Sequence, residues 1–489
     1  MTARPDSGGV DARLSAAEAA GADVELLRNF GSKRPSLKER FEAGKALRAK
    51  VPREDHAVFE QLANRPDPVA ILEQQNLARV QKLVPVRFAR MLASPFTFLR
   101  GSAAVMASDL AGTPTTNLMV QACGDMHVAN FGVFGSAERN LIFAINDFDE
   151  THPGCWEWDL KRLAASAAVA ANFVGGDKHD AFDAARTIAQ AYRRRMRDFS
   201  QMGFLEVWYS RIEESAILNT LSPRASRAAK RIMAKARQKG HIQMFDKLTE
   251  DVDGERRILE EPPLIVRETH NEDGAPIAGP VNALLKSYGA SLSPDRRHLL
   301  SRYRLVDVAR KVVGVGSVGT RCWIALLLGL DNDDPLFLQI KEAPPSVLAG
   351  YATSTLPHEH QGQRVVAGQR LIQGSPDIFL GWSDGPKSHF YVRQLADLKG
   401  SVKFQEGKRE SLSSLTEYWA LCGWALALAH AKSGDAATIA GYCGKSEVLD
   451  YAIAKFSLTY AKRTDRDYDL LDAARRTGRI RVASDEVVN

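Results

Sequence analysis

Apolar residues recur at the spacing of an α-helix over much of the chain, and shorter apolar runs interrupt this periodicity twice. The helical spacing covers 36 to about 92 and returns over 157–205 and 411–489. Short apolar runs at 118–122 and 141–145, separated by glycine and asparagine, predict strands. The first part of the chain is therefore expected to be helical and to carry a small β element.

The second interruption, 304–400, is a longer block of apolar runs with the period of strands. The predicted strands are 306–315, 322–328, 336–340 and 390–395, with a helix at about 360–373. The stretch before the block, 252–300, contains Pro, Gly and Glu and is predicted to be a linker with a short strand at 263–266. The block is therefore expected to form a separate β-rich unit.

These patterns predict an α/β protein of the α+β kind with four segments. Residues 1–35 are expected to be a flexible N-terminal segment, 36–300 a helical lobe, 301–400 a small β-rich lobe, and 401–489 helices that complete the helical lobe. Basic residues at helical spacing over 222–240 predict a further helix. A solvated face is favoured there over phosphate or nucleic-acid contact, because no aromatic residues are interleaved.

Composition narrows the class of protein. The 489 residues are 45% hydrophobic and 25% charged, which supports a buried core and excludes global disorder. No apolar run is long enough to span a membrane, and the polar start of the chain has no secretory h-region, so a cytoplasmic location is expected. The five cysteines form no CxxC pair, which argues against a zinc site. The net charge of +6 suits anionic ligands without indicating nucleic acid.

The strongest chemical signal lies in the first β element. Gly124-Asp125-Met126-His127-Val128-Ala129-Asn130 is followed, after an apolar stretch, by Asn146-Asp147-Phe148-Asp149-Glu150. Phosphoryl transfer needs a carboxylate that orients the acceptor, hard oxygen ligands for magnesium, and positive charge on the phosphates. Asp125 can supply the carboxylate, and Asn130 and Asp147 can supply the metal oxygens. A polar turn capped by Asx side chains is the alternative; a two-metal phosphoesterase would need further histidine motifs that the chain lacks.

A second signal is the glycine-rich run Gly314-Val315-Gly316-Ser317-Val318-Gly319. A dinucleotide fold would begin a helix here, but strands are predicted to follow, the second of them ending in Lys341. Glycines let backbone N–H groups approach phosphates, and a lysine adds a point charge. The alternatives are a tight hairpin and an ordinary lysine at the end of a strand. The predicted nucleotide-binding residues are Gly314, Gly316, Ser317, Gly319 and Lys341.

The first motif resembles the catalytic loop and metal-binding segment of aminoglycoside and choline phosphotransferase-type kinases. Those proteins read His-Gly-Asp-x-His-x-x-Asn and then Ile-Asp-Phe/Trp-x-Asp, and Trp158-Asp159-Leu160 resembles their Tyr-Asp-Leu-Ala. The resemblance implies that Asp125 orients or deprotonates an acceptor hydroxyl. It further implies that Asn130 and Asp147 hold magnesium and that Asp159 braces the catalytic loop. Cys123 departs from the pattern, which has histidine there.

The second motif resembles the glycine loop and the Val-Ala-Ile-Lys strand of protein kinases. In such an arrangement an acidic residue pairs with the lysine. Glu359, at the start of the predicted helix 360–373, is favoured for this role, while Gln369 lies within the helix and Glu342 is expected on the opposite face of the strand.

Three further assignments follow from the same resemblance. The stretch 389–395 looks like the strand that leads into an adenine-binding hinge, where the backbone of Gln394 and Leu395 would contact the base. Asp149 and Glu150 would support a second metal or the substrate, or act as local caps. Arg100 would contact phosphate or form a structural ion pair.

The order of the motifs is unusual, because the catalytic segment comes long before the glycine loop. The helix predicted at 415–431 resembles the one that normally leads into the catalytic loop, but Asp435 after it lacks an asparagine five residues on. We therefore expect a two-lobed, protein-kinase-like fold with circularly permuted order. The expected activity is ATP- and magnesium-dependent phosphate transfer to a hydroxyl of a small molecule or protein. AMP transfer, a non-catalytic nucleotide-binding scaffold and a metal-dependent hydrolase are the alternatives.

From about 87 to 479 the chain also resembles an uncharacterised bacterial family known only as a domain of unknown function. The matching stretches are 94–101, 146–151, 339–343 and 391–395. This resemblance covers most of the chain and implies little about the substrate.

Overall fold

The computed structural model of the chain describes residues 31–59, 64–238, 240–267, 278–331, 334–352, 359–386, 388–395 and 398–484. The N-terminal segment that was predicted to be flexible lies outside this part, except for 31–35. Helices make up most of the regular structure, and all the strand pairs are antiparallel. The prediction of a mixed, α+β class is therefore confirmed.

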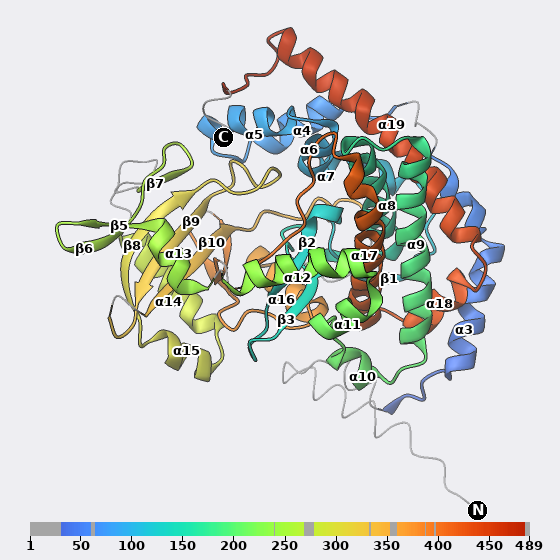
Figure 1. Ribbon diagram of the computed structural model, residues 1–489, viewed down its shortest axis with the longest axis horizontal. Helices are drawn as coiled ribbons and strands as arrows, with labels where there is room; N and C mark the ends of the chain where they lie inside the picture. Colours follow the sequence, from blue (N-terminus) through green and yellow to red (C-terminus); the bar gives the residue numbers. More distant parts are fainter. Residues whose placement is uncertain are drawn as a thin grey trace, which may run out of the picture.

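The chain enters the helical lobe through short helices (Figure 1). Their starts follow capping chemistry, since Ser36 and Ser94 each form a capping box and Asp67 caps a helix that begins with Pro68. The elements are α3 (Leu37–Ala46), η1 (Leu47–Ala49), η2 (Arg53–Ala57), α4 (Pro68–Asn76), η3 (Gln81–Leu83), α5 (Val84–Met91), α6 (Pro95–Gly101) and α7 (Ala103–Ala111). Helices α6 and α7 contact α8 (Trp156–Phe173), which places them next to the loops described below.

Two small antiparallel pairs follow and carry the first motif. Strand β1 (Met119–Ala122) pairs with β4 (His152–Cys155), and β2 (Phe131–Gly135) forms a hairpin with β3 (Leu141–Ile145). A short 3-10 turn, η4 (Val128–Asn130), leads into β2. Loop 123–130 therefore leaves the end of β1, and segment 146–150 leaves the end of β3, so both motifs emerge beside each other.

The centre of the helical lobe is a bundle of long helices from both halves of the chain (Figure 1). Helix α17 lies along α9, and α8 and α19 also contact α9. The bounds are α9 (Lys178–Ser200), η5 (Arg409–Ser411), α17 (Leu412–Ser433), α18 (Ala436–Cys443) and α19 (Val448–Arg476). The alanine-rich stripe of α8 is almost completely buried in this bundle. The helices predicted over 157–205 and 411–489 thus form one core, although they are far apart in sequence.

The second unit is a six-stranded antiparallel sheet with the order β11-β12-β10-β9-β8-β7. Its strands are β7 (Ile265–Arg267), β8 (Arg304–Lys311), β9 (Cys322–Leu328), β10 (Pro335–Glu342), β11 (Gly381–Asp384) and β12 (His389–Gln394). Helix α16 (Gln361–Ile372) lies in the chain between β10 and β11 and contacts β11 and β12. The four main strands and this helix agree with the sequence prediction to within a few residues.

Alternate residues of β9 face opposite sides of the sheet, as expected for a strand. Ala325 and Leu327 pack with α14 (Ala278–Ser291), whereas Ile324 and Leu326 pack with α13 (His241–Leu248). The β-ribbon β5 (Thr249–Val252) and β6 (Glu255–Ile258) and the helix α15 (Pro294–Leu300) also belong to this unit. The short strand predicted at 263–266 corresponds to β7, but the prediction of a linker over the rest of 252–300 is wrong for the described residues. Helices in this stretch cover the sheet. Their apolar side chains are buried against its strands, and the local sequence does not indicate this burial.

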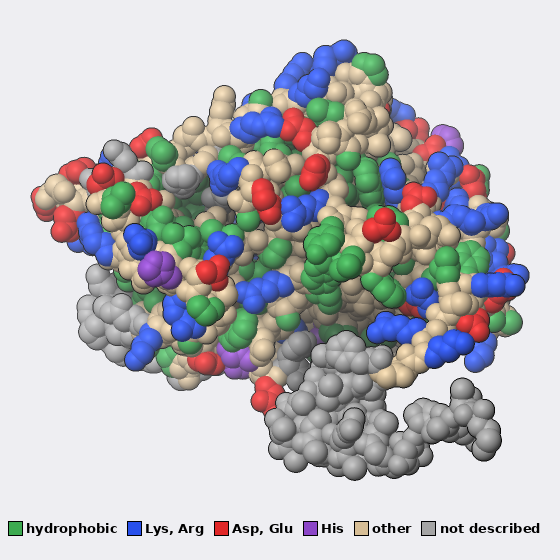
Figure 2. Space-filling view, turned by 90° about the horizontal axis from the view of Figure 1, so that it is seen from below, with side chains coloured by type: hydrophobic (Ala, Val, Ile, Leu, Met, Phe, Trp, Pro, Cys, Tyr) green, Lys and Arg blue, Asp and Glu red, His purple; other side chains and the backbone are tan. Residues whose placement is uncertain are grey.

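The remaining helices join the two units. They are α10 (Phe204–Tyr209), α11 (Glu214–Thr220) and α12 (Pro223–Arg237), and α12 confirms the predicted basic helix. In Figure 2, basic and acidic side chains are interspersed over the face seen from below. Of the helices in the described ranges, none has the length and apolar character needed to cross a lipid bilayer.

Candidate functional site

Loop 123–130 begins with a glycine that the site requires. Gly124 has a φ of 81°, in the left-handed region, and a Cβ at this position would collide with the carbonyl oxygen of Glu150. Any other residue would be strained here and would push loop 123–130 away from segment 146–150. The glycine before Asp125 therefore lets the two motifs approach each other closely.

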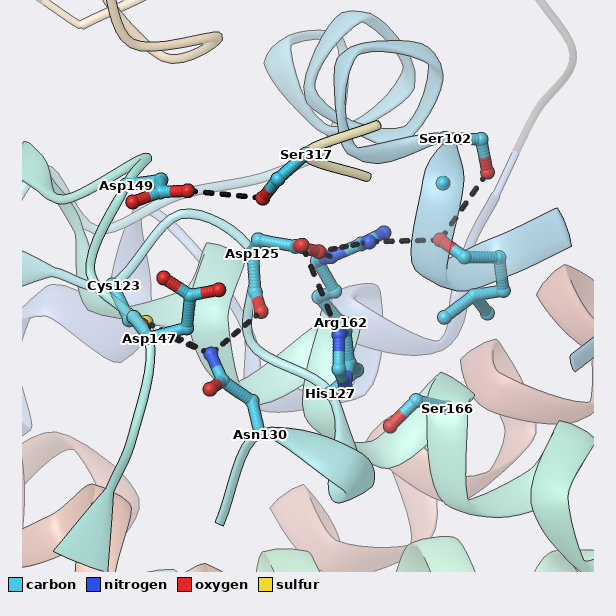
Figure 3. A network of polar contacts seen from close by, with 12 residues as sticks. Ser102, Cys123, Asp125, His127, Asn130, Asp147, Asp149, Arg162, Ser166 and Ser317 are labelled. Carbon is cyan, nitrogen blue, oxygen red and sulfur yellow. Dashed lines mark hydrogen bonds and ion pairs between the residues drawn. The ribbon is translucent and has the colours of Figure 1, made fainter. Parts of the chain in front are cut away.

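Helix α8 holds this loop through two side chains, Asp159 and Arg162, and Figure 3 shows Arg162 bound to Asp125. Asp159, only 1% exposed, accepts hydrogen bonds from the backbone N–H groups of Cys123 at 2.6 Å and Gly124 at 3.0 Å. One turn further along, the Arg162 guanidinium binds Oδ1 of Asp125, with Nε at 3.0 Å. The brace that the resemblance implied for Asp159 is present as these two hydrogen bonds, and Arg162 adds a second anchor.

We expect Asp159→Asn to lower the free energy of unfolding by about 2 kcal/mol, because an amide leaves one of two buried N–H groups without an acceptor. Urea unfolding of the full chain measures this value. Asp183→Asn, on the exposed side of α9, is the control and should change the value by less than about 0.5 kcal/mol. Equal stability of the Asp159→Asn and wild-type proteins would contradict the bracing role.

Asn130 is almost completely buried beneath the same loop. Its Nδ2 donates to the carbonyl oxygens of Asp147 at 3.0 Å and Asp125 at 3.4 Å, which ties the two motifs together. Its Oδ1 accepts no hydrogen bond from the described residues, so this oxygen remains available to a cation. The structure therefore gives Asn130 a structural role in addition to the metal role expected of it.

Lys341 joins the sheet to the acidic segment. Its Nζ lies 2.6 Å from Oδ2 of Asp149 and 3.5 Å from Oδ1 of Asp147, and only 2% of its side chain is exposed. Burial alone would lower the pKa of Lys341, but Asp147 and Asp149 raise it well above its usual value. The lysine is therefore a fixed positive charge between the two lobes.

The two aspartates that face Lys341 differ in their surroundings. Asp149 also accepts hydrogen bonds from Tyr391 Oη at 2.5 Å and from Ser317 Oγ at 3.1 Å. Asp147 keeps 45% of its side chain exposed. Burial opposes its ionisation, but Lys341 and Arg393 nevertheless lower its pKa below the usual value. Asp147 is thus an ionised carboxylate with free coordination positions, whereas Asp149 is held.

The glycine loop 314–319 covers this cluster. Gly314 and Gly319 have φ values of 65° and 87°, and both positions favour glycine. Arg90 donates to the carbonyl oxygen of Gly314 at 2.7 Å, and Arg79 donates to that of Val318 at 2.6 Å. A Cβ on Gly316 would lie 3.9 Å from Oδ2 of Asp125, so the middle of the loop sits directly over the predicted catalytic carboxylate.

These elements enclose a small polar cavity of about 50 Å³, which we call the carboxylate cavity. Its lining comes from both lobes: Gln75, Arg79, Arg87, Arg100, Gly101, Ala103, Asp125, Asp147, Asp149, Glu150, Gly316, Ser317, Thr320, Glu342 and Pro344. The early acidic stretch and the late glycine-rich stretch thus share one hollow. A cavity of this volume has room for a few waters or one small anion, but not for a whole nucleotide.

A second cavity of about 190 Å³, the hinge cavity, is lined in part by Asn146, the residue before Asp147. Gln394 and Leu395 line it, together with basic residues that include Arg393 and Lys399. The backbone N–H of Gln394 donates to Asp377, and that of Leu395 donates to the carbonyl oxygen of Phe337 at 3.0 Å. Both N–H groups expected to contact a base are therefore engaged within the chain. Burial and the charge of Arg393 lower the pKa of Lys399 to about 8.

Glu359 does not reach the site. It is exposed just before α16, and the acids that pair with Lys341 are Asp149 and Asp147. The side chain from α16 that contacts the acidic segment is Arg364, which donates to the carbonyl oxygen of Asp149 at 2.9 Å. The expected pair of Lys341 with an acid on this helix is thus replaced by a pair with segment 146–150.

Sequence reasoning missed the roles of Arg162 and Asp149. Arg162 follows Asp159 by three residues, so both lie on one face of α8, and this spacing was a signal that could have found it. For Asp149, the sequence leaves a metal or substrate role and a local cap as alternatives. Nothing in its local sequence indicates that a strand of the β unit brings Lys341 to it.

Glu150 is the titrating carboxyl of the cavity. Burial raises its pKa to about 7, although the backbone N–H of Val347 donates to it at 2.7 Å and opposes the rise. A folded-state pKa above the unfolded value means that the folded protein binds the extra proton. Glu150 therefore favours folding below about pH 4.5, and this contribution is lost as the pH rises through about 7.

Relative to Glu150→Gln, we expect the wild type to lose about 2 kcal/mol of stability between pH 4.5 and pH 8, allowing for the partial exposure of the side chain. Chemical unfolding of both proteins across this range measures the difference. The exposed Glu54→Gln should show no such trend, and a constant difference between wild type and Glu150→Gln would refute the assignment.

The family described as "Uncharacterized protein conserved in bacteria" (DUF2252) matches residues 79–474 of the chain. No curated protein and no solved structure matches it. The matched region contains both motifs and all of the lining of the carboxylate cavity except Gln75, so nearly the whole site lies within the part that the family shares.

Proposed function

The chain belongs to the DUF2252 family, whose description carries no activity, and we propose from the site itself that the protein is an ATP- and magnesium-dependent phosphotransferase. It would move the terminal phosphate of ATP to a hydroxyl group. The observation that carries the proposal is the meeting of Lys341 with Asp147 and Asp149 beneath a glycine loop, next to the anchored carboxylate of Asp125. Phosphoryl transfer uses this set of groups, because positioning and charge stabilisation supply most of its catalysis.

The donor set fits a magnesium ion. Asp147 offers an ionised and partly exposed carboxylate, Asp149 lies beside it, and Oδ1 of Asn130 accepts no hydrogen bond from described residues. All three are hard oxygen donors, and magnesium keeps several waters in addition. When bound, such an ion would neutralise charge that develops on the transferred phosphate.

Asp125 is placed to receive the acceptor. Arg162 fixes Oδ1, while Oδ2 accepts no hydrogen bond from the described residues and faces the glycine loop. The acceptor oxygen would form a bond to the terminal phosphorus as the bond from that phosphorus to the bridging oxygen breaks. ADP leaves with the bridging oxygen, and the hydroxyl proton passes to Asp125. Lys341 and the N–H groups of the glycine loop would balance the charge of the phosphates.

The arrangement of the β unit supports a kinase-like nucleotide lobe. The glycine loop joins β8 to β9, Lys341 lies on the next strand, and α16 follows before the sheet continues. A glycine loop followed by a strand that carries the lysine is the order found in protein kinases. Because the catalytic segment precedes this unit and α17 closes the helical lobe behind it, we propose a circularly permuted version of that fold.

The nucleotide would extend from the hinge cavity across Asp147 to the glycine loop. Arg393 lines the hinge cavity, and its charge acts on Asp147, which lines the carboxylate cavity. The carboxylate cavity is smaller than a triphosphate, so binding requires the glycine loop to lift from Asp125 and Asp149. The contacts from Arg79 and Arg90 are the ones that would have to break.

Incubation with ATP labelled either on the terminal phosphate or on the α-phosphate tests the proposal. Transfer of the terminal label alone supports a phosphotransferase. Transfer of the α-label would identify an AMP transferase, release of free phosphate without transfer a hydrolase, and binding without turnover a scaffold. Each of these last three results overturns the proposed reaction.

A further inference from the structure

Three arginines line one wall of the carboxylate cavity. Arg79 lies between α4 and η3, Arg87 lies on α5 and Arg100 lies on α6, so all three come from the N-terminal part of the helical lobe rather than from the sheet. Across the described residues, none of the three forms an ion pair with a carboxylate. Buried and half-buried charges are normally paired, so three unpaired cations on one wall need a reason.

Arg87 is the most buried of them, with 1% of its surface exposed. Its guanidinium donates only to neutral oxygens: Oδ1 of Asn76, Oε1 of Gln75 at 2.8 Å and the carbonyl oxygen of Gly101 at 3.0 Å. These bonds fix the orientation of the side chain, but none of them is to a carboxylate. Burial and the neighbouring Arg79 lower the pKa of Arg87 well below its usual value.

Arg100 is less constrained. It makes no hydrogen bond with any residue in the described ranges, and its Nε is buried without a partner. Its side chain lies over the ring of Phe96, with the guanidinium carbon 5.9 Å from the centroid. The group is therefore held at the cavity by packing while its donors stay free.

The start of α7 meets the same wall. Gly101 and Ala103 line the cavity, and no side chain of a described residue caps this helix. The first N–H groups of a helix attract anions, and arginines beside them strengthen the site. The helix end and the unpartnered arginines are independent features that favour the same type of ligand.

The acids of the cavity do not supply the missing counterion. Asp125 is bound by Arg162, Asp149 by Lys341, and Glu342 by Arg321. Glu150 accepts a hydrogen bond from the backbone N–H of Val347 at 2.7 Å and forms no ion pair with any of the three arginines within the described ranges. The acids of the cavity therefore act on the three arginines only from beyond ion-pair distance, because each of Asp125, Asp149 and Glu342 is already bound to another cation.

We propose that Arg79, Arg87, Arg100 and the first turn of α7 bind a phosphate group carried by the acceptor. The acceptor is then a small phosphorylated compound with a free hydroxyl. This identification of the acceptor rests on the proposed phosphotransferase function, whereas the assignment of the anion site does not depend on that function. Three guanidinium groups and a helix start suit a dianion with several acceptor oxygens. Because Arg100 lies beside Asp125, a phosphate on this wall would direct the hydroxyl of the same molecule toward Oδ2 of Asp125.

Titration calorimetry of the full-length protein with inorganic phosphate, without nucleotide or magnesium, tests the site. We expect saturable binding that Arg100→Met weakens by about tenfold or more, since a charge-assisted hydrogen bond is lost. Arg100 is chosen because it makes no hydrogen bond that folding requires, and an unchanged melting temperature of the variant would establish this. Arg227→Met, an exposed position on α12, removes the same charge and should leave the affinity unchanged.

A second titration with inorganic phosphate, in the presence of saturating ADP and magnesium, distinguishes a phosphate of the acceptor from a phosphate of the nucleotide. Simultaneous binding of inorganic phosphate and ADP supports an acceptor site. Competition between them would assign the arginines to the nucleotide and overturn the proposal. Equal phosphate affinity of wild type and Arg100→Met would refute the anion site, whatever the label-transfer experiment shows. Absence of label transfer, with phosphate binding intact, would refute the phosphotransferase and not the anion site.

Discussion

Asp147→Ala is expected to lower magnesium-dependent phosphate transfer by about a thousandfold or more, because it removes the partly exposed carboxylate that is proposed to bind the magnesium ion. The fold should persist. The Asp147 side chain is 45% exposed and its distance to Lys341 is 3.5 Å, while Asp149 keeps Lys341 paired at 2.6 Å. Label transfer from ATP, measured as a function of magnesium concentration, gives the activity, and thermal unfolding gives the stability.

Asp183→Ala is a matched control for this experiment. Its side chain on α9 is 44% exposed, and it lies outside both cavities. This variant should keep full activity. Stabilisation of the protein by ATP with magnesium should be lost in Asp147→Ala and retained in Asp183→Ala. Full activity of Asp147→Ala would remove this residue from the metal site.

The parts of the site that could be predicted are those that local chemistry determines. A glycine before Asp125, an asparagine five residues after it and an acid after an apolar strand are readable because each depends on neighbours in sequence. The strands of the β unit were readable for the same reason. Alternation and turn residues mark β9 and β10 without any knowledge of what covers them.

The parts that could not be predicted depend on contacts between distant segments. The pairing of Lys341 with Asp149 rather than with Glu359 is decided by how β10 meets segment 146–150, and no local pattern contains this distance. The helices α14 and α15 were predicted as a linker, because their sequence includes Gly, Pro and Ser and their apolar residues are buried only against the sheet. Propensity is a weak guide where tertiary packing supplies the stability.

The three arginines that line the carboxylate cavity, Arg79, Arg87 and Arg100, also show that contacts between distant segments cannot be predicted from local sequence. Nothing in the helical pattern around Arg87 and Arg100 distinguishes them from surface arginines. For Arg100, the sequence leaves a phosphate contact and a structural ion pair as alternatives. Only the folded chain reveals that the described residues offer Arg100 no ion pair. The remaining assignment, phosphate contact, stands as the proposal made above.

Lys341→Met is expected to have a large effect on both stability and activity. It leaves the carboxylate of Asp149, which is only 20% exposed, without its cation, and breaking such a pair costs about 3 kcal/mol. Phosphate transfer should fall with it, because the positive charge on the phosphates is lost. Urea unfolding and label transfer measure the two effects separately.

The double variant Lys341→Met/Asp149→Asn distinguishes the two roles. An amide at position 149 can accept from Tyr391 through its oxygen and donate to the hydroxyl of Ser317 through its nitrogen, with no unpaired charge. Most of the lost stability should therefore return while activity stays low. Lys161→Met is the matched control, since Lys161 is a fully buried lysine on α8 with no ion pair to a described residue. Replacing it should be neutral or stabilising and should leave transfer unchanged. Recovery of activity together with stability in the double variant would show that Lys341 acts only through the fold, and the nucleotide role proposed for it would then fail.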